Sequence, residues 1–209
     1  MVATRQRSPR GSGEQLRAEI IRAAKDLMAA ASSSDDVSIR AVANAVGVSS
    51  PSIYLHFADK QELINAVVID VFEALDRDMV AAGADATTPI ERLLAYGLAY
   101  ERFGWAHPEH YRIATMDPCP RPDEDQMLAN GCFVHFRSAV EECIAAGDIA
   151  GGDSLATTIE LWAAAHGITA LLVTKPDLPV ADPMAMAERV LVSAALGHAP
   201  ALPLTSPSP

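Results

Sequence analysis

A run of small polar side chains near residue 50 has the types and spacing needed to contact nucleic acid. Residues 49–52 are three serines and a proline at the start of a short predicted helix, and Tyr54 and His56 add a phenol and an imidazole. Small polar residues at a helix N-terminus allow close approach to phosphates and to base edges. The predicted chemistry is hydrogen bonding to a duplex.

Two cations flank this run. Arg40 begins the preceding predicted helix, which in such an arrangement crosses the DNA backbone, and Lys60 begins the following helix. Both are within reach of a phosphate. From spacing alone an alternative stays open, in which the segment is a three-helix support with solvated polar faces.

Two short helices must position these side chains. Ser38 is a suitable N-cap for the first helix, and Gly47 ends it because glycine accepts the left-handed conformation of a tight turn. Ser49 is a suitable N-cap for the second helix, with Pro51 in its first turn. Helices this short need packing from neighbours. The pattern predicts a helix-turn-helix within a small bundle.

Longer predicted helices supply that packing. Before the motif, apolar residues recur at spacings of three and four and form one stripe: Leu16, Ile20, Ala23, Ala24, Leu27, Met28 and Ala31. After it, Asp59 and Glu62 have the form of a capping box that opens a long helix.

Helical periodicity continues along the rest of the chain. Further helices are expected at about 89–106, 108–116, 123–146, 153–174 and 183–196, between breaks rich in Gly and Pro. No segment keeps a strand period for long. The predicted fold class is all-α, with an N-terminal helix-turn-helix three-helix bundle joined to a larger helical domain.

Composition and charge limit the function. The net charge of −11 is uneven, because residues 1–60 carry 8 basic and 6 acidic groups, whereas residues 61–209 carry 8 and 21. DNA affinity depends on a local positive face, so this favours a DNA-facing head on an acidic body. No apolar run is expected to span a bilayer, and no secretory signal is apparent, so a cytoplasmic location is expected. The three cysteines are expected to be reduced thiols.

The motif region resembles the TetR-type (TetR/AcrR) transcriptional regulators. The resemblance spans about residues 16–63 and is carried by the runs Ser38-Ile39-Arg40-Ala41-Val42-Ala43, Gly47-Val48-Ser49, Ser52-Ile53-Tyr54-Leu55-His56-Phe57 and Lys60-Gln61-Glu62-Leu63. It implies a DNA-binding domain whose contacts are Arg40, Ser49, Ser50, Pro51, Ser52, Tyr54, His56 and Lys60. Because serine cannot make the bidentate contacts of Arg or Gln, shape readout is expected to supplement direct readout.

The second half resembles one C-terminal domain type of the same family. The matching runs are Tyr100-x-x-Phe103, His107-Pro108-Glu109, Tyr111-Arg112 and Trp162-x-x-x-His166-Gly167. They imply a ligand-binding and dimerisation domain. The expected organisation is a disordered arm at 1–12, the helix-turn-helix domain at 13–60, the ligand-binding and dimerisation domain at 61–199 and a disordered tail at 200–209. Arg5, Arg7 and Arg10 of the arm either reach DNA or belong to a solvated tail.

The predicted helices at 153–174 and 183–196 are apolar on more than one face, so each should be buried on two sides. Two-fold pairing would bury one side and would space two recognition helices for a pseudo-palindromic operator. The alternative is a central helix in a monomer.

A pocket for a small, largely apolar ligand is expected among the central helices. Its candidate lining residues, for each of which core packing is the alternative role, are Phe72, Tyr100, Phe103, Trp105, Tyr111, Met116, Phe133, Phe136, Trp162 and His166.

Other chemistry has little support. No metal-ligand spacing such as Cys-x-x-Cys occurs, and we expect neither a metal nor a cofactor. Cys132 and Cys143 are expected to be inert buried thiols, with a redox sensor as the alternative. The run Asp123-Glu124-Asp125 is expected to begin a helix, or to border an entrance that attracts cations.

The leading hypothesis is a homodimeric repressor of double-stranded operator DNA that a small-molecule ligand releases. One alternative is a protein-binding module of the same fold without DNA binding. Another is an all-α enzyme, which no nucleophile elbow, phosphate loop or metal motif supports.

Overall fold

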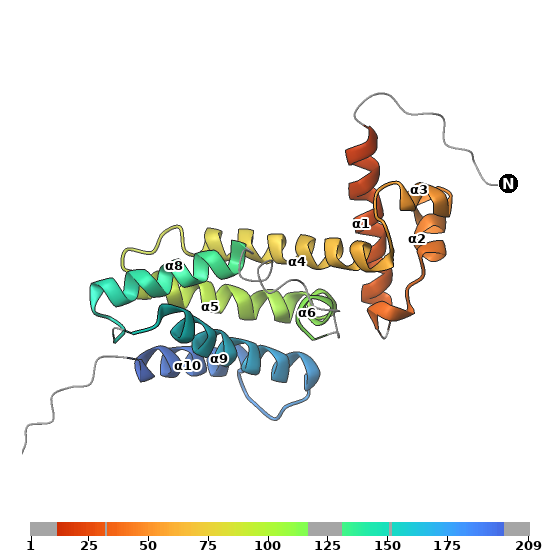
Figure 1. Ribbon diagram of the computed structural model, residues 1–209. Helices are drawn as coiled ribbons and strands as arrows, with labels where there is room; N and C mark the ends of the chain where they lie inside the picture. The colour runs from red at the N-terminus through yellow and green to blue at the C-terminus, as the bar shows by residue number, and fades with distance from the viewer. Residues whose placement is uncertain (1–11, 32, 117–130, 151, 199–209) are drawn as a thin grey trace, which may run out of the picture. The chain divides into compact units, whose positions relative to one another are not determined.

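The structure is a computed structural model that describes residues 12–31, 33–116, 131–150 and 152–198 (Figure 1). The first elements are α1 (Ser12–Ala30), the 3₁₀ turn η1 (Ser34–Asp36), α2 (Ile39–Val46), α3 (Ser50–Tyr54) and α4 (Lys60–Ala82). They are followed by α5 (Pro89–Ala106), α6 (Pro108–Thr115), α8 (Gly131–Ala146), α9 (Ser154–Thr174) and α10 (Pro183–Gly197). The described residues contain no strand, and the predicted all-α class is confirmed.

The chain divides into two compact units. Unit 1 comprises Met1–Ala74 and His107–Asn130, and unit 2 comprises Leu75–Ala106 and Gly131–Pro209. This division differs from the boundary at residue 60 expected from the sequence. α4 is shared between the units, and α6 packs with unit 1 rather than with the larger unit.

The core of unit 1 is built from the apolar stripe of α1. Ile20, Ala24 and Met28 are fully buried, and they pack in one cluster with Ile53 in the last turn of α3 and with Phe57 just after it. α2 and α3 bury one side each, which supplies the packing that such short helices need.

α6 is attached to the C-terminal end of α1. Ile113 is buried in the same apolar cluster. Nη2 of Arg112 donates to the main-chain oxygens of Met28 at 3.0 Å and Ala31 at 3.1 Å. Both carbonyls lie at the end of α1, where the Met28 oxygen also accepts from the Ala31 N–H at 3.2 Å, so the guanidinium acts as an additional C-cap from another helix.

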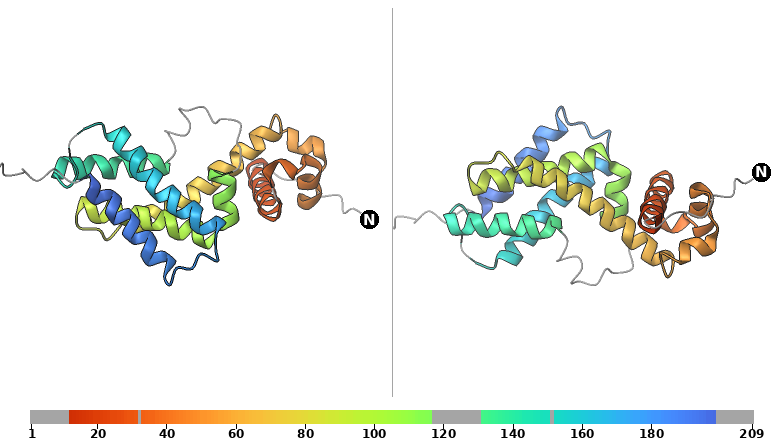
Figure 2. Two further views of the ribbon diagram at one scale, coloured as in Figure 1. Left: turned by 90° about the horizontal axis from the view of Figure 1, so that it is seen from below. Right: turned by 90° about the horizontal axis from the view of Figure 1, so that it is seen from above.

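Unit 2 is a helical bundle in which α5 packs against α8, α9 and α10, and α9 also packs against α8 and α10 (Figure 1, Figure 2). α5 approaches α10 closely at Gly97, where a Cβ atom would come within 2.9 Å of the Leu191 side chain. Glycine there permits the short distance between the two helices.

α9 is the most apolar of the long helices, and by length and composition alone it could cross a membrane, contrary to the expectation from the sequence. It lies at the centre of unit 2, where Leu161, Ala165 and Leu172 are buried. The helix packs against α5, α8 and α10.

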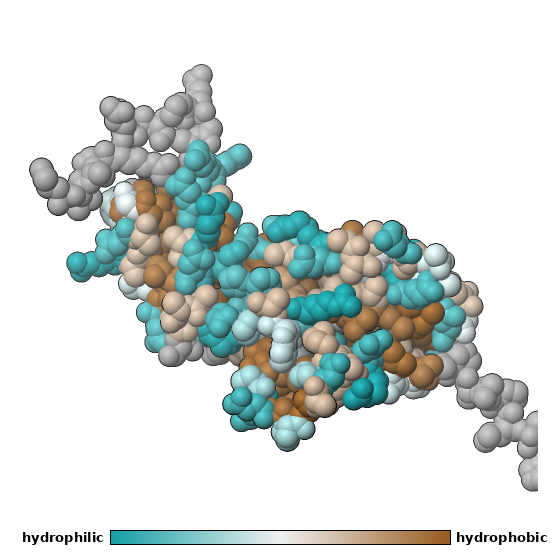
Figure 3. Space-filling model, turned by 180° about the vertical axis from the view of Figure 1, so that it is seen from behind, coloured by the Kyte–Doolittle hydropathy of each residue, from teal (hydrophilic) through white to brown (hydrophobic). Residues whose placement is uncertain are grey.

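Large apolar side chains also remain at the surface of the last two helices. Ile159 and Leu171 of α9 are nearly half exposed, and Leu196 of α10 is 68% exposed. The space-filling view shows apolar residues among hydrophilic ones on the surface (Figure 3). The second apolar side that the sequence predicts for these helices is therefore present in the monomer.

Several expectations fall outside the described residues. They concern the three arginines of the arm, Cys119, the acidic run at 123–125 and the tail at 200–209.

Candidate functional site

The turn between α2 and α3 is set by local chemistry. Ser38 Oγ accepts a hydrogen bond from the Ala41 N–H at 3.2 Å, which caps α2 as predicted. Gly47 ends α2 with φ of 79°, in the left-handed region that favours glycine. Ser49 occupies the N-cap position of α3 but makes no side-chain cap; its Oγ lies 2.8 Å from Ser52 Oγ instead.

α3 presents one side to the core and the other to solvent. Ile53 and Phe57 are buried, whereas Tyr54 is 52% exposed and Leu55 is 85% exposed. An exposed phenol beside an exposed leucine is a surface suited to apolar contact with a thymine methyl group and to hydrogen bonding. Leu55 was not among the predicted contacts. Its position two residues after buried Ile53, at the end of a helix, was the signal that could have found it.

The predicted DNA contacts all lie in unit 1. Four are exposed, namely Arg40, Ser49, Pro51 and Tyr54, and four are half-buried, namely Ser50, Ser52, His56 and Lys60. The predicted DNA-contact residues therefore include no charged group of unit 2.

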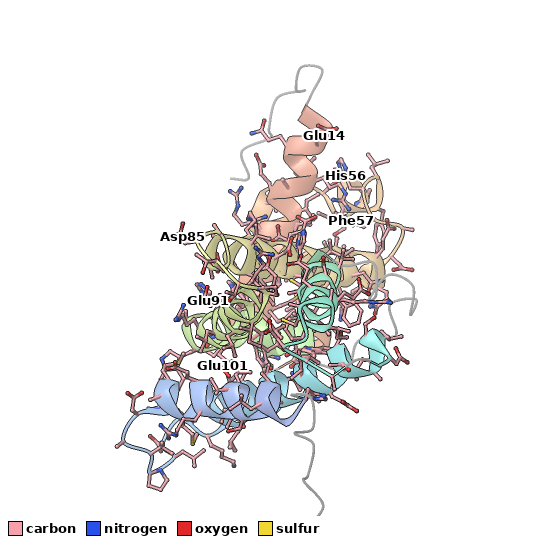
Figure 4. All side chains as sticks on the ribbon, turned by 90° about the vertical axis from the view of Figure 1, so that its left-hand side faces the viewer. Glu14, His56, Phe57, Asp85, Glu91 and Glu101 are labelled. Carbon is pink, nitrogen blue, oxygen red and sulfur yellow. The ribbon has the colours of Figure 1, made fainter. Side chains whose placement is uncertain are left out.

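α1 supports the end of α3 from one side. The Arg17 guanidinium lies over the Phe57 ring, 5.0 Å from its centroid. Figure 4 labels His56 and Phe57 beside α1. Lys25 Nζ pairs with Asp70 Oδ2 at 2.5 Å and joins α1 to α4.

The start of α4 is fixed by the predicted pair of carboxylates. Asp59 Oδ1 accepts from the Glu62 N–H at 2.8 Å, and Glu62 Oε2 accepts from the Ala58 N–H at 2.5 Å. The second bond reaches one residue further back than in the usual capping box. This arrangement holds Lys60 at the first turn of α4.

Unit 2 brings four of the predicted pocket residues together. Tyr100 of α5 has its hydroxyl 3.3 Å from His166 Nδ1, and Trp162 Nε1 donates to the same hydroxyl at 3.4 Å. The Phe133 ring meets Trp162 edge-on, with centroids 6.5 Å apart. We call Tyr100, Phe133, Trp162 and His166 the aromatic cluster.

The direction of one of these hydrogen bonds follows from its donor. The indole N–H of Trp162 can only donate, so the Tyr100 oxygen accepts from it. The direction of the Tyr100–His166 bond depends on the imidazole tautomer, because a phenol and an imidazole can each donate or accept. Burial lowers the pKa of His166, which agrees with a neutral imidazole.

The remaining predicted pocket residues occupy other places. Phe72 and Tyr111 belong to unit 1, where Tyr111 is fully buried and Phe72 packs on the apolar cluster. Phe103 is buried on α5 and Phe136 is half-buried on α8, whereas Met116 is 37% exposed just after α6. For these residues ligand contact stays a prediction.

An open groove in unit 2 lies between α5 and α10 and has a volume of about 490 Å³. Its lining residues are Leu98, Arg102, Trp105, Ala106, Asp182, Met184, Ala185 and Glu188. Of these lining residues, only Trp105 was also predicted from the sequence to line a ligand pocket.

Glu101 of α5 is the most unusual charged residue in the described part of the chain. It is 1% exposed, and neither carboxylate oxygen has a hydrogen-bond partner. Burial raises its pKa to about 8; nearby Arg102 opposes the rise and Glu188 adds to it. The sequence pattern did not single it out.

The two described cysteines are poor nucleophiles. Burial raises the pKa of Cys132 to about 12, with a contribution from Asp76, and the pKa of Cys143 to about 11. Asp76 Oδ1 lies 2.7 Å from His135 Nδ1. No group of three or more His, Cys, Asp or Glu residues in the described segments is placed to hold a metal ion.

Comparison with known proteins gives two family matches. Residues 20–67 match the model for bacterial regulatory proteins of the tetR family, and residues 93–194 match the model for the tetracyclin repressor-like C-terminal domain. A curated relative is the uncharacterized HTH-type transcriptional regulator Rv0681 of Mycobacterium tuberculosis, 27% identical over 143 residues. The match covers 67% of this chain and 62% of the relative, which is less than two thirds of its length.

Solved structures share the fold. A protein of unknown function from Rhodococcus sp. RHA1 has a TM-score of 0.74 at 24% identity, covering 94% of this chain and 100% of that one. A TetR family transcription regulator from Marinobacter aquaeolei VT8 has a TM-score of 0.69 at 16% identity, covering 89% and 98%. The fatty acid degradation regulator FadR from Bacillus halodurans also scores 0.69 at 16% identity, covering 86% and 98%.

Proposed function

The chain belongs to the TetR family of DNA-binding transcriptional regulators, and we propose that it is a cytoplasmic homodimeric repressor which a small-molecule ligand releases from its operator. The observation that carries the DNA-binding part is the division of α3, with Ile53 buried while Tyr54 and Leu55 are exposed. A helix held from one side and open on the other is free to enter a major groove.

Arg40 and Lys60 supply charge at the two ends of this surface. Arg40 is exposed at the first turn of α2, and Lys60 begins α4 behind the Asp59 cap. We assign Lys60 and His56 to phosphates, and Arg40, Tyr54 and the serines of 49–52 to the backbone and base edges. Phosphate contacts fix the register, whereas base contacts carry the sequence preference.

The exposed apolar side chains of α9 and α10 support dimerisation through these helices. Leu196 and Ile159 would lose water contact there, and large exposed apolar surfaces commonly mark interfaces. A two-fold dimer would present two copies of α3 to half-sites one helical turn apart.

Ligand release needs a conformational link between the two units. α4 runs without interruption from Lys60 to Ala82 and belongs to both units, so it is the natural lever. A ligand can shift the DNA-binding equilibrium only by its difference in affinity between the two conformers. We assign no enzymatic activity to the chain.

The test measures release from DNA that the protein binds. A duplex from upstream of the protein's own coding sequence is titrated with the dimer, and small molecules are then screened for loss of the complex. We expect some compounds to weaken operator binding at unchanged salt. Operator affinity that no compound in a broad screen alters would contradict ligand release while leaving DNA binding intact.

A further inference from the structure

Glu101 is buried where α5 packs against α10 (Figure 4). A buried carboxylate normally accepts hydrogen bonds or pairs with a cation, because leaving it unpartnered costs free energy. Here both oxygens lack a partner. Such a group persists when it has a function, and the position within the ligand-binding half of the chain indicates a ligand.

The neighbouring groove opens to the surface beside Glu101, although Glu101 is not one of its lining residues. Glu188 of α10 lines the groove and is close enough to Glu101 for their charges to interact. Arg102, the residue after Glu101, also lines the groove, and its side chain is exposed. The buried carboxylate therefore lies beside the groove rather than in an isolated part of the core.

The groove combines apolar and acidic side chains. Leu98, Trp105 and Met184 offer apolar and aromatic surface, and Trp105 is 44% exposed. Asp182 Oδ1 is already used, since it accepts from the Ala185 N–H at 2.9 Å and caps α10. Glu188 is exposed and not committed to such a cap.

We propose that the α5–α10 groove binds an apolar organic monocation, whose charge is countered by Glu101 and Glu188 and whose hydrocarbon part packs on Leu98, Trp105 and Met184. An aromatic ring and carboxylates together suit an ammonium group. Glu101 is sealed from solvent, so binding requires a local outward movement of α10 from α5. This inference rests on the proposed function in one respect: the groove is taken as an effector site.

Other ligand charges fit the groove less well. An anion could pair with Arg102 but would meet Glu188, and it would supply no counter-charge for Glu101. A neutral apolar compound would supply no counter-charge for the ionised form of Glu101. A cation alone converts the unpartnered carboxylate into an ion pair.

Binding should release a proton. The charged groups that act on Glu101 are Arg102 on its own helix and Glu188 on α10, and none of the described residues on α8 or α9 contributes. With its pKa near 8, Glu101 is mostly protonated at pH 7 and must ionise to pair with a cation. Affinity for a permanent cation should therefore rise by about tenfold per pH unit below pH 8, and level off above it.

The experiment uses three probes of equal chain length: octyltrimethylammonium, octanol and octanoate. Each is titrated into the full-length protein by calorimetry in two buffers of different ionisation enthalpy, and by tryptophan fluorescence. The Trp105→Phe variant distinguishes the fluorescence change of Trp105, in the groove, from that of Trp162. We expect the cation to bind at least tenfold more tightly than the other two probes, with release of about one proton at pH 7.

Variants separate the roles of the carboxylates. Glu101→Gln should weaken cation binding by about tenfold or more and abolish the proton release. Glu101→Met, which leaves no unpaired polar group, gives the same result if the Gln variant folds poorly. Glu73→Gln, at an exposed position on α4, is the matched control and should bind like the wild type.

The test of cation binding in the groove can succeed or fail independently of the test of ligand release from DNA. Equal affinity for the three probes, or cation binding unchanged in both Glu101 variants, would overturn the inference even if other compounds release DNA. Cation binding with proton release but no effect on operator affinity would support the site and count against effector control through it.

Discussion

Arg112 of α6 donates from Nη2 to the main-chain oxygen of Met28, in the last turn of α1. The same nitrogen also donates to Ala31. A side chain 84 residues away in sequence thus caps the helix on which the DNA-binding core is built. This contact ties α6 to α1 within unit 1.

Replacing Arg112 by Met should remove this cap while keeping much of the side-chain volume. Two carbonyls at the end of α1 would lose a charged donor, and we expect the free energy of unfolding to fall by about 1–3 kcal/mol. Urea denaturation followed by circular dichroism measures it. Arg189→Met, at an exposed position on α10, is the control. Equal stability of the two variants would show that the cap contributes nothing.

Glu101 should make stability depend on pH. Its pKa is raised from an ordinary 4.5 to about 8, so the folded protein holds this proton more tightly than the unfolded chain does. The resulting stabilisation is complete below pH 4.5 and is lost as the pH rises toward 8. Relative to Glu101→Met, the free energy of unfolding of the wild type should fall by about 1.4 kcal/mol per pH unit between about pH 5 and 8.

The difference between the two proteins is the informative quantity, since all other titrating groups are common to both. Denaturation at several pH values supplies it. A difference that is flat across this range would mean that Glu101 titrates near its ordinary pKa in the folded protein.

Lys60 and Arg40 should affect DNA binding in different ways. Lys60→Ala removes a phosphate contact, so affinity should fall alike for all duplexes and the salt slope should shrink by about 1. Arg40→Ala should in addition relax the preference for the operator over a scrambled duplex. Fluorescence anisotropy at several salt concentrations gives both quantities. If both substitutions changed the preference for the operator over the scrambled duplex equally, the roles assigned to Lys60 and Arg40 would be contradicted.

Cys132 and Cys143 should resist alkylation in the folded protein. Their pKa values of about 12 and 11 leave almost no thiolate at pH 7.5. Iodoacetamide labelling, read by mass spectrometry of the two peptides, should be slow until urea unfolds the chain. Rapid labelling of either peptide in the native protein would instead favour the redox-sensor alternative.

The helix-turn-helix could be predicted because its signals are local. Ser38 caps α2 and Gly47 turns the chain through chemistry contained within a few residues. Ser49 was predicted to cap α3, but its hydroxyl contacts the hydroxyl of Ser52 instead. Sequence spacing cannot decide which of these two nearby partners the Ser49 side chain takes. Trp162 and His166 are four residues apart and so share a helix face, whereas the contact of both with the Tyr100 hydroxyl depends on the packing of α5 against α9.

Long-range packing was not accessible in the same way. Helical periodicity assigns α6 correctly but gives no reason to place Ile113 in the core of unit 1. Glu101 and Arg102 stand together in an otherwise apolar stretch of α5, and charged residues there are typical of solvent-facing positions. The burial of Glu101 depends on packing between helices, and α5 approaches α10 closely one turn earlier, at Gly97 and Leu191.

The central claim is that the exposed side of α3 enters a DNA major groove, and one titration tests it most directly. Labelled duplex from the protein's own upstream region is mixed with the wild type and with Tyr54→Ala, alongside a scrambled duplex, at low and moderate salt. We predict tight, salt-dependent binding that prefers the upstream sequence and is largely lost in Tyr54→Ala. Equal, weak association with both duplexes, unchanged by the substitution, would contradict it.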